Sequence, residues 1–114
     1  MEASVLLVDD VYLNLRLMAK TLQTMGITYH VSLSGKKAVE LCTKHKYDVI
    51  LMDYYMGGIN GVEASEQIKN SPLNSKTRII IVTASEYDDR IRNAGLSYMQ
   101  KPVSREFIKN LFAK

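Results

Sequence analysis

The chain has 114 residues, of which 46% are hydrophobic and 24% charged, and this composition is ordinary for one globular domain. Its 15 basic and 12 acidic residues are scattered, so the formal net charge of +3 gives little support to nucleic-acid binding. The single cysteine excludes an internal disulfide, and no apolar stretch is long enough for a membrane span. We therefore expect one domain over residues 1–114, cytoplasmic and reducing surroundings, no membrane insertion and no direct nucleic-acid contact.

The first part of the chain predicts a buried strand, a helix and a second strand. Residues 5–8 are continuously apolar and run into Asp9, as expected for a strand covered on both faces. A helix is predicted over residues 11–25, and Gly26 follows it as a helix-terminating glycine. Residues 27–33 alternate loosely, and their polar face predicts a strand at the edge of a sheet. The apolar residues at helical spacing in the helix are Leu13, Leu17, Met18, Leu22 and Met25.

The middle of the chain predicts two helices around a strand that ends in a carboxylate. Ser34 is a candidate N-cap for a helix over residues 35–45. Residues 49–52 are continuously apolar and run into Asp53, after which a glycine-rich loop follows. A further helix is predicted over residues 61–70, where an Asn-Ser-Pro sequence ends it. The predicted buried stripe of the first of these helices consists of Ala38, Val39, Leu41 and Cys42.

The next segment predicts a linker, a strand and a short helix. Residues 73–77 are polar and indicate a linker. Residues 79–82 are purely aliphatic and predict a buried strand that stops at Thr83. Between residues 85 and 94 there is room for a helix of only about two or three turns. This helix is therefore expected to be the shortest of the fold.

The end of the chain predicts a last strand and a last helix. Residues 96–100 read as a short strand that Lys101 and the following proline terminate. Ser104 is a candidate N-cap for a helix over residues 104–114. The side chains expected to point inward from that helix are Phe107, Ile108, Leu111 and Phe112.

The alternation of strands and helices predicts an α/β fold with a parallel sheet and helices on both faces. In open sheets of this class, ligands bind beyond the carboxyl ends of the strands. Most of the predicted strands end in a polar side chain that is able to do chemistry, so we expect these side chains to form one site. They are Asp9 with Asp10, Asp53, Thr83 and Lys101.

Each of these residues also has an ordinary structural explanation when it is considered alone. Asp53 could stop a strand and open a turn, and an acid pair is often simply solvated. Thr83 is a β-branched strand residue, and Lys101 resembles a surface lysine. Only their combination at one edge of the sheet favours a functional site. Cys42 and His45 lack the further ligands that a zinc site requires.

Four segments resemble the receiver domain of two-component response regulators, the CheY-like superfamily. They are VLLVDD with the acid pair, VILMDYYMGGING with Asp53, IIIVTA with Thr83, and YMQKP with an aromatic residue and Lys101. The resemblance covers essentially the whole chain. It implies a doubly wound, flavodoxin-like fold, in which a five-stranded parallel sheet of order 2-1-3-4-5 is flanked by five helices. It also implies a single receiver domain without an output domain, either stand-alone or from a hybrid histidine kinase.

The resemblance implies a phosphoacceptor in a phosphorelay rather than an enzyme with a separate substrate. Asp53 would take a phosphoryl group from a phosphohistidine donor, which is a histidine kinase or a histidine phosphotransfer protein. A carboxylate can act as the nucleophile toward phosphorus. Lys101 and Thr83 would then contact phosphoryl oxygens. Thr83 and Tyr98 would switch the surface that a downstream protein target binds.

The resemblance also implies Mg²⁺ as the cofactor. Asp10 and Asp53 would bind the ion directly, Asp9 through water, and Tyr55 through its backbone carbonyl. Such hard oxygen ligands suit an octahedral ion that keeps some of its waters. Without a cation, the three carboxylates would repel one another and raise the pKa of at least one of them.

Several positions depart from the usual pattern of the family or mark a subgroup within it. Gly57 stands where proline is usual and predicts a more mobile loop. The short interval 83–101 predicts a truncated fourth helix. Asn14, four residues past the acid pair, resembles receivers attached to hybrid histidine kinases. Tyr55 and Ser85 occupy positions that flank the route of an attacking water, and the bulk of Tyr55 predicts slow self-dephosphorylation.

Two other classes of function remain open at this point. A Mg²⁺-dependent phosphohydrolase would use Asp53 on small phosphate esters, although an obvious extra general acid and a substrate-covering domain are lacking. A receiver-like module that binds proteins without phosphorylation would keep the same fold. Turnover of a phosphate ester would indicate the hydrolase, and absence of Mg²⁺-dependent phosphorylation would indicate the binding module.

Overall fold

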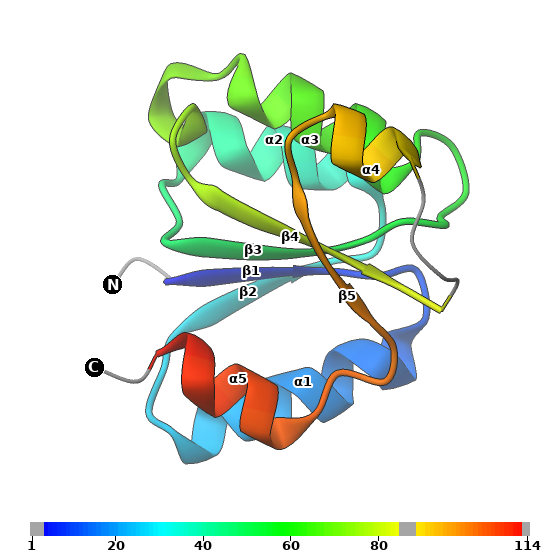
Figure 1. Cartoon of the computed structure of the whole chain (residues 1–114). Coiled ribbons are helices and arrows are strands. Elements are labelled where there is room, and N and C mark those ends of the chain that lie inside the picture. Colours follow the sequence, from blue (N-terminus) through cyan, green and yellow to red (C-terminus); the bar gives the residue numbers. More distant parts are fainter. Residues whose placement is uncertain (1–3, 85–88, 113–114) are drawn as a thin grey trace.

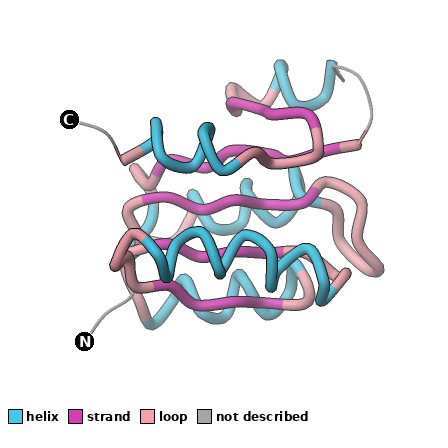
Figure 2. The backbone as a smooth tube through the Cα atoms, turned by 90° about the horizontal axis from the view of Figure 1, so that it is seen from below, coloured by secondary structure: helices cyan, strands magenta, loops and turns pink. Residues whose placement is uncertain are grey.

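A five-stranded parallel sheet between two layers of helices forms the fold (Figure 1, Figure 2). The computed structural model describes residues 4–84 and 89–112. The strand order is β2-β1-β3-β4-β5, as predicted. The strands are β1 (Val5–Val8), β2 (Tyr29–Ser32), β3 (Val49–Asp53), β4 (Arg78–Thr83) and β5 (Ser97–Gln100). The helices are α1 (Tyr12–Thr24), α2 (Gly35–Lys44), α3 (Gly61–Lys69), α4 (Asp89–Asn93) and α5 (Arg105–Leu111), with a 3-10 turn η1 (Pro72–Asn74).

The two faces of the sheet carry separate apolar clusters because successive strand residues point to opposite sides. From β3, Ile50 and Met52 pack in a cluster with α2, α3 and α4. Val49 and Leu51 pack on the other face, with α1 and α5. Figure 1 shows the same division of the helices. All of β3 is buried, which explains its continuous apolar sequence.

Strand β2 lies at the edge of the sheet, as predicted, but its outward side chains include apolar ones. Val31 is 43% exposed and Leu33, just beyond the strand, is 51% exposed. Ser32 is buried instead, and its hydroxyl donates to the Ser34 carbonyl at 2.8 Å. Its backbone carbonyl accepts the Asp9 N–H at 3.1 Å. Ser32 on the predicted polar face is therefore buried, and its backbone carbonyl holds the residue that follows β1.

Helix α1 forms as predicted, but two of its leucines face solvent. Leu13 and Leu17 are 62% and 61% exposed. The stripe that packs on the sheet passes instead through Leu15, Met18 and Leu22. All these residues recur at helical spacing, so the periodicity identifies the helix without identifying its buried face. The start of α1 thus presents apolar side chains to solvent.

The helix caps follow the predicted chemistry and add one that the sequence reading missed. The hydroxyls of Ser34 and Ser104 accept backbone N–H groups of α2 and α5 at 3.1 and 3.0 Å. Helix α3 begins with a capping box, in which Asn60 accepts the N–H of Glu63 at 2.9 Å and the carboxylate of Glu63 accepts the N–H of Asn60 at 3.0 Å. This box fixes where the loop after β3 ends.

The predicted linker over residues 73–77 is an anchored turn rather than a free connection. Asn74 is fully buried, and its amide donates to the carbonyls of Cys42 and His45 at 2.8 Å each. Its side-chain oxygen accepts the N–H of Tyr47 at 3.0 Å. One buried amide therefore joins η1 to the end of α2 and to the segment before β3.

The last helices agree with their predicted positions where they are described. Residues 85–88 lie outside the described residues, as does the last pair, 113–114, so the full length of the predicted helix over 85–94 stays a prediction. In α5, Ile108 is buried. Packed against the same cluster are Phe107, Leu111 and Phe112. Within the described part of the chain, no helix combines the length and apolarity needed to cross a membrane.

Candidate functional site

Three acidic side chains meet beyond the carboxyl ends of β1 and β3. Asp9 and Asp10 follow β1, and Asp53 is the last residue of β3. One carboxylate oxygen from each lies within 4.8 Å of those from the other two. Asp9 and Asp53 are only 1% and 5% exposed, whereas Asp10 is open to solvent. The structure thus brings the acids named from the sequence into one cluster.

The ammonium of Lys101 lies between two of these carboxylates. Its Nζ atom is 3.2 Å from Oδ2 of Asp9 and 3.0 Å from Oδ1 of Asp53. The backbone N–H of Lys101 donates to the Thr83 carbonyl at 2.7 Å, which ties the end of β5 to the end of β4. Four strand ends therefore contribute to the same site, in which one ammonium contacts two of the three clustered carboxylates.

The backbone that follows Asp53 is held from two sides. The N–H of Tyr54 donates to the Val82 carbonyl at 3.0 Å, and the Tyr54 carbonyl accepts the N–H of Gly61 at 2.9 Å. A Cβ atom on Gly61 would overlap the carbonyl oxygen of Asp53 and lie 3.0 Å from Cα of Tyr54. The first residue of α3 thus packs directly on the backbone of the candidate phosphoacceptor.

The electrostatics of the cluster show an excess of negative charge. Burial raises the pKa of Asp53 from 3.8 to about 6; the charges of Asp9 and Asp10 add to the rise, and Lys101 opposes it. Burial lowers the pKa of Lys101, but its bonds to Asp53 and Asp9 outweigh this and leave the pKa raised. A hard divalent cation fits this site, because the converging ligands are all oxygens and their charge is only partly neutralised.

The remaining predicted residues differ in their burial. Thr83 is fully buried at the end of β4, whereas Tyr98 on β5 is 39% exposed. Tyr55 is 57% exposed, and its ring lies against that of Tyr54, with centroids 4.6 Å apart. Ser85 lies outside the described residues. The aromatic side chain of Tyr55 thus stands at the surface two residues from Asp53.

Two donors to Asp9 were not predicted from the sequence. The N–H of Val11 donates to Oδ1 of Asp9 at 2.9 Å, and the side-chain amide of Asn14 donates to Oδ2 at 3.1 Å. Asn14 had been singled out only as a mark of a subgroup. Asp9 precedes α1, so the spacing along the helix gives no signal for this bond, which depends on how α1 leaves β1.

A small cavity of about 140 Å³ opens beside this amide and Lys101. It lies between α1 and the segment after β5. Its apolar lining comes from Leu17, Met18, Val82, Pro102 and Val103. The rim of the acidic site is therefore apolar on the side of α1.

The two histidines lie together beside Tyr47, and the cysteine is buried. The Nδ1 atom of His30 is 2.7 Å from the Tyr47 hydroxyl, and the His30 and His45 ring centroids are 5.0 Å apart. Burial and the charge of His45 lower the pKa of His30. Burial raises the pKa of the Cys42 thiol to about 12. Within residues 4–84 and 89–112, the aspartate cluster is the group that offers three close metal ligands.

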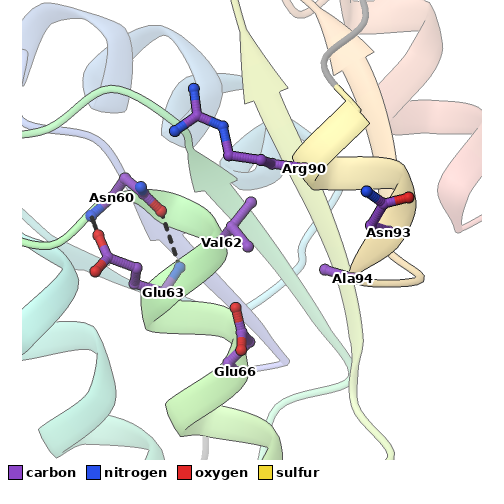
Figure 3. A pocket seen from close by; sticks show the side chains of 7 residues that line it. All are labelled: Asn60, Val62, Glu63, Glu66, Arg90, Asn93 and Ala94. Carbon is purple, nitrogen blue, oxygen red and sulfur yellow. Dashed lines mark hydrogen bonds between the residues drawn. The ribbon is translucent and has the colours of Figure 1, made fainter.

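A groove of about 720 Å³ lies between α3 and α4 (Figure 3). Glu63 and Glu66 line it on the α3 side, and Arg90 lines it on the α4 side. The guanidinium carbon of Arg90 lies 5.7 Å from the ring centroid of Tyr54. Helix α4 is thereby in contact with the residue that follows Asp53.

A family model described as the response regulator receiver domain matches residues 5–113. The chain belongs to this family. It is 36% identical over 117 residues to the signal transduction histidine-protein kinase BarA of Escherichia coli K12, covering 97% of this chain but 12% of the kinase. It is also 32% identical over 108 residues to the polar-differentiation response regulator DivK of Brucella ovis, covering 91% and 88% of the two chains. Receivers thus occur among its relatives both within a kinase and as nearly whole proteins.

A solved receiver structure has the same fold. The receiver domain of the sensor histidine kinase PA1611 from Pseudomonas aeruginosa PAO1 superposes with a TM-score of 0.86 at 26% identity. The match covers 97% of this chain and 94% of that one. That receiver holds a magnesium ion in its active-site cleft. The predicted doubly wound receiver fold is therefore confirmed.

Proposed function

We propose that this receiver accepts a phosphoryl group on Asp53 from the phosphohistidine of a histidine kinase or histidine phosphotransfer protein. A carboxylate oxygen of Asp53 would bond to phosphorus while the phosphorus–nitrogen bond of the donor breaks. The observation that carries this proposal is the convergence of the three carboxylates with the Lys101 ammonium at one edge of the sheet. Phosphoryl transfer relies mainly on such positioning and charge.

The acidic cluster would hold Mg²⁺ through Asp10 and Asp53 directly, through Asp9 by way of water, and through the Tyr55 backbone carbonyl. Bound Mg²⁺ supplies positive charge that offsets the carboxylates and the phosphoryl oxygens. Lys101 already lies 3.0 Å from Asp53, so its ammonium can bind an oxygen of a phosphoryl group that is bonded to that carboxylate.

The donor would dock on the apolar residues at the start of α1. Val11, Leu13 and Leu17 are 49%, 62% and 61% exposed. The N–H of Val11 donates to Asp9, and Leu17 lines the cavity that Asp9 and Lys101 also line. Apolar side chains exposed in this way favour contact with another protein. A phosphohistidine held there would have a short path to Asp53.

The decisive experiment is a phosphotransfer assay with purified candidate phosphohistidine donors, with and without Mg²⁺, read by intact mass. The expected result is one phosphoryl group per chain, dependent on Mg²⁺ and absent from Asp53→Asn. Uptake by Asp53→Asn at the parental rate would exclude Asp53 as the acceptor. Repeated turnover of a small phosphate ester would instead indicate a hydrolase.

Thr83 and Tyr98 would convert phosphorylation into a change of surface. The Thr83 hydroxyl would move toward the phosphoryl group, and Tyr98 would rotate inward, which alters the surface of α4, β5 and α5. Phosphorylated Thr83→Ala is therefore expected to show much smaller backbone chemical-shift changes in β5 and α5 than the phosphorylated parent. Equal chemical-shift changes in the two proteins would show that Thr83 takes no part in the switch.

Tyr55 is expected to prolong the life of the aspartyl phosphate. Its bulky side chain follows Asp53 by two residues, at a position that flanks the route of an attacking water, so it would screen the acceptor carboxylate. Tyr55→Ala should therefore lose its phosphoryl group several-fold faster in Mg²⁺, measured by intact mass after removal of the donor. Tyr12→Ala, which removes an exposed tyrosine from α1, is the matched control. Identical rates of phosphoryl loss for Tyr55→Ala and the parent would show that Tyr55 does not protect the aspartyl phosphate.

A further inference from the structure

The carboxylate of Asp9 is surrounded by donors from three parts of the chain. Oδ1 accepts the N–H of Val11 at 2.9 Å. Oδ2 accepts both the Asn14 amide at 3.1 Å and the Lys101 ammonium at 3.2 Å. Asp9 is 1% exposed, so water cannot readily replace a donor that leaves. Two donors, one neutral and one charged, thus share a single buried oxygen.

The Lys101 ammonium also contacts a second carboxylate. The same Lys101 ammonium lies 3.0 Å from Asp53. If Asp53 carries a phosphoryl group, the added oxygens draw this ammonium away from Asp9. A buried carboxylate that then lost all donors to Oδ2 would be strongly destabilised. The Asn14 amide remains in place, because it is carried by α1 and does not contact Asp53 in the interactions the structure gives.

We propose that Asn14 is a positioning residue that holds the Asp9 carboxylate in orientation when Lys101 turns to the phosphoryl group. A neutral amide can orient the carboxylate without neutralising it, so Asp9 keeps its charge for a cation. A lysine or arginine at this position would orient Asp9 but would also offset that charge. This inference rests on the proposed function, because only a phosphoryl group on Asp53 would draw the Lys101 ammonium away from Asp9.

The position of Asn14 in the chain supports this role. Its backbone N–H donates to the Val11 carbonyl at 3.0 Å, and the N–H of Val11 donates to Asp9. The helix is held on the sheet by Leu15, the next residue, which is 1% exposed. The amide therefore approaches Asp9 from a fixed backbone, at the boundary between the acidic cluster and the exposed Leu13.

The inference is tested by Mg²⁺ affinity of the unphosphorylated protein, measured by NMR titration. The variant is Asn14→Leu, which has nearly the same shape and no donor, and Asn14→Ala serves as a second variant. Gln23→Ala is the matched control, because it removes a side-chain amide near the other end of α1 that donates to the Tyr29 hydroxyl at 2.6 Å. Each substitution is made both in the parent and in Lys101→Met, and circular dichroism establishes that each variant is folded.

Because both donors share Oδ2, their losses should be non-additive. In the Lys101→Met background, loss of the Asn14 amide should weaken Mg²⁺ binding about tenfold, as for other residues that support a metal ligand. In the background that retains Lys101, loss of the Asn14 amide should weaken Mg²⁺ binding by a clearly smaller factor. Gln23→Ala should leave the Mg²⁺ affinity unchanged in both backgrounds. Equal factors in the two backgrounds, or no loss in either, would overturn the inference.

A phosphorylation arm separates this inference from the proposed function. The parent and Asn14→Leu are incubated with acetyl phosphate at saturating Mg²⁺, and uptake is read by intact mass. If the parent takes up no phosphoryl group here or from protein donors, the proposed function fails, while the Mg²⁺ titrations still decide whether Asn14 holds Asp9. If the parent is phosphorylated and the titrations show additive losses, only the role of Asn14 fails.

Discussion

The Asp53→Asn variant is expected to lose phosphoryl uptake and yet to be more stable than the parent when Mg²⁺ is removed. The fold holds Asp53 almost fully buried beside two other carboxylates, which raises its pKa from 3.8 to about 6. At neutral pH the ionised Asp53 therefore lowers the free energy of unfolding of the parent, whereas the neutral asparagine does not. Lys101 keeps Asp9 as its partner in the variant, so no ammonium is left without a carboxylate.

The size of this gain follows from the pKa shift. Each unit corresponds to about 1.4 kcal/mol, so the free energy of unfolding should rise by something on the order of 1–3 kcal/mol at pH 7.5. Since the folded pKa lies above the unfolded value, the parent loses stability as the pH rises from about 4 through about 6. The difference between variant and parent should therefore be larger at pH 7.5 than at pH 5.

Urea unfolding in EDTA at these two pH values measures the effect. Asp10→Asn is the control, because this carboxylate belongs to the same cluster but is exposed, and its gain should be smaller. An Asp53→Asn domain that is less stable than the parent at pH 7.5 would show that the bond to Lys101 outweighs burial at this site.

The sequence predicted those features that depend on burial along one element or on the common direction of the strands. The run into Asp53 was identifiable because a strand buried on both faces needs no alternation. The convergence of Asp9, Asp53 and Lys101 followed from parallel strands that end at one edge. Neither inference required knowledge of which side chains touch.

What the sequence could not supply was the choice between equivalent faces and the contacts between side chains. Leu13 and Leu15 both fit a helical spacing, yet only Leu15 is buried, because packing on the sheet selects one stripe. Asn74 reads as a linker residue, but it is fully buried, because three backbone groups meet around it. The bond between Asn14 and Asp9 likewise depends on how α1 leaves β1.

Gly61 is the residue at which a single methyl group is expected to disturb the site most. It begins α3, and a Cβ atom there would overlap the Asp53 carbonyl oxygen and press on the backbone of Tyr54. These are backbone atoms at the end of a buried strand and cannot rotate away. Either α3 or the end of β3 must shift, and a shift of β3 moves the Asp53 carboxylate relative to Lys101.

Gly61→Ala should therefore lower the free energy of unfolding by about 1–3 kcal/mol, as overpacking does, and slow phosphorylation well beyond any loss of folded protein. The matched control is Gly57→Ala in the same loop, because a Cβ atom on Gly57 would meet nothing within 4 Å. That change should leave stability within about 0.5 kcal/mol or raise it slightly by restricting the unfolded chain. Urea unfolding and the rate of phosphorylation by acetyl phosphate measure both effects. Parental values of both for Gly61→Ala would mean that α3 can move aside without displacing Asp53.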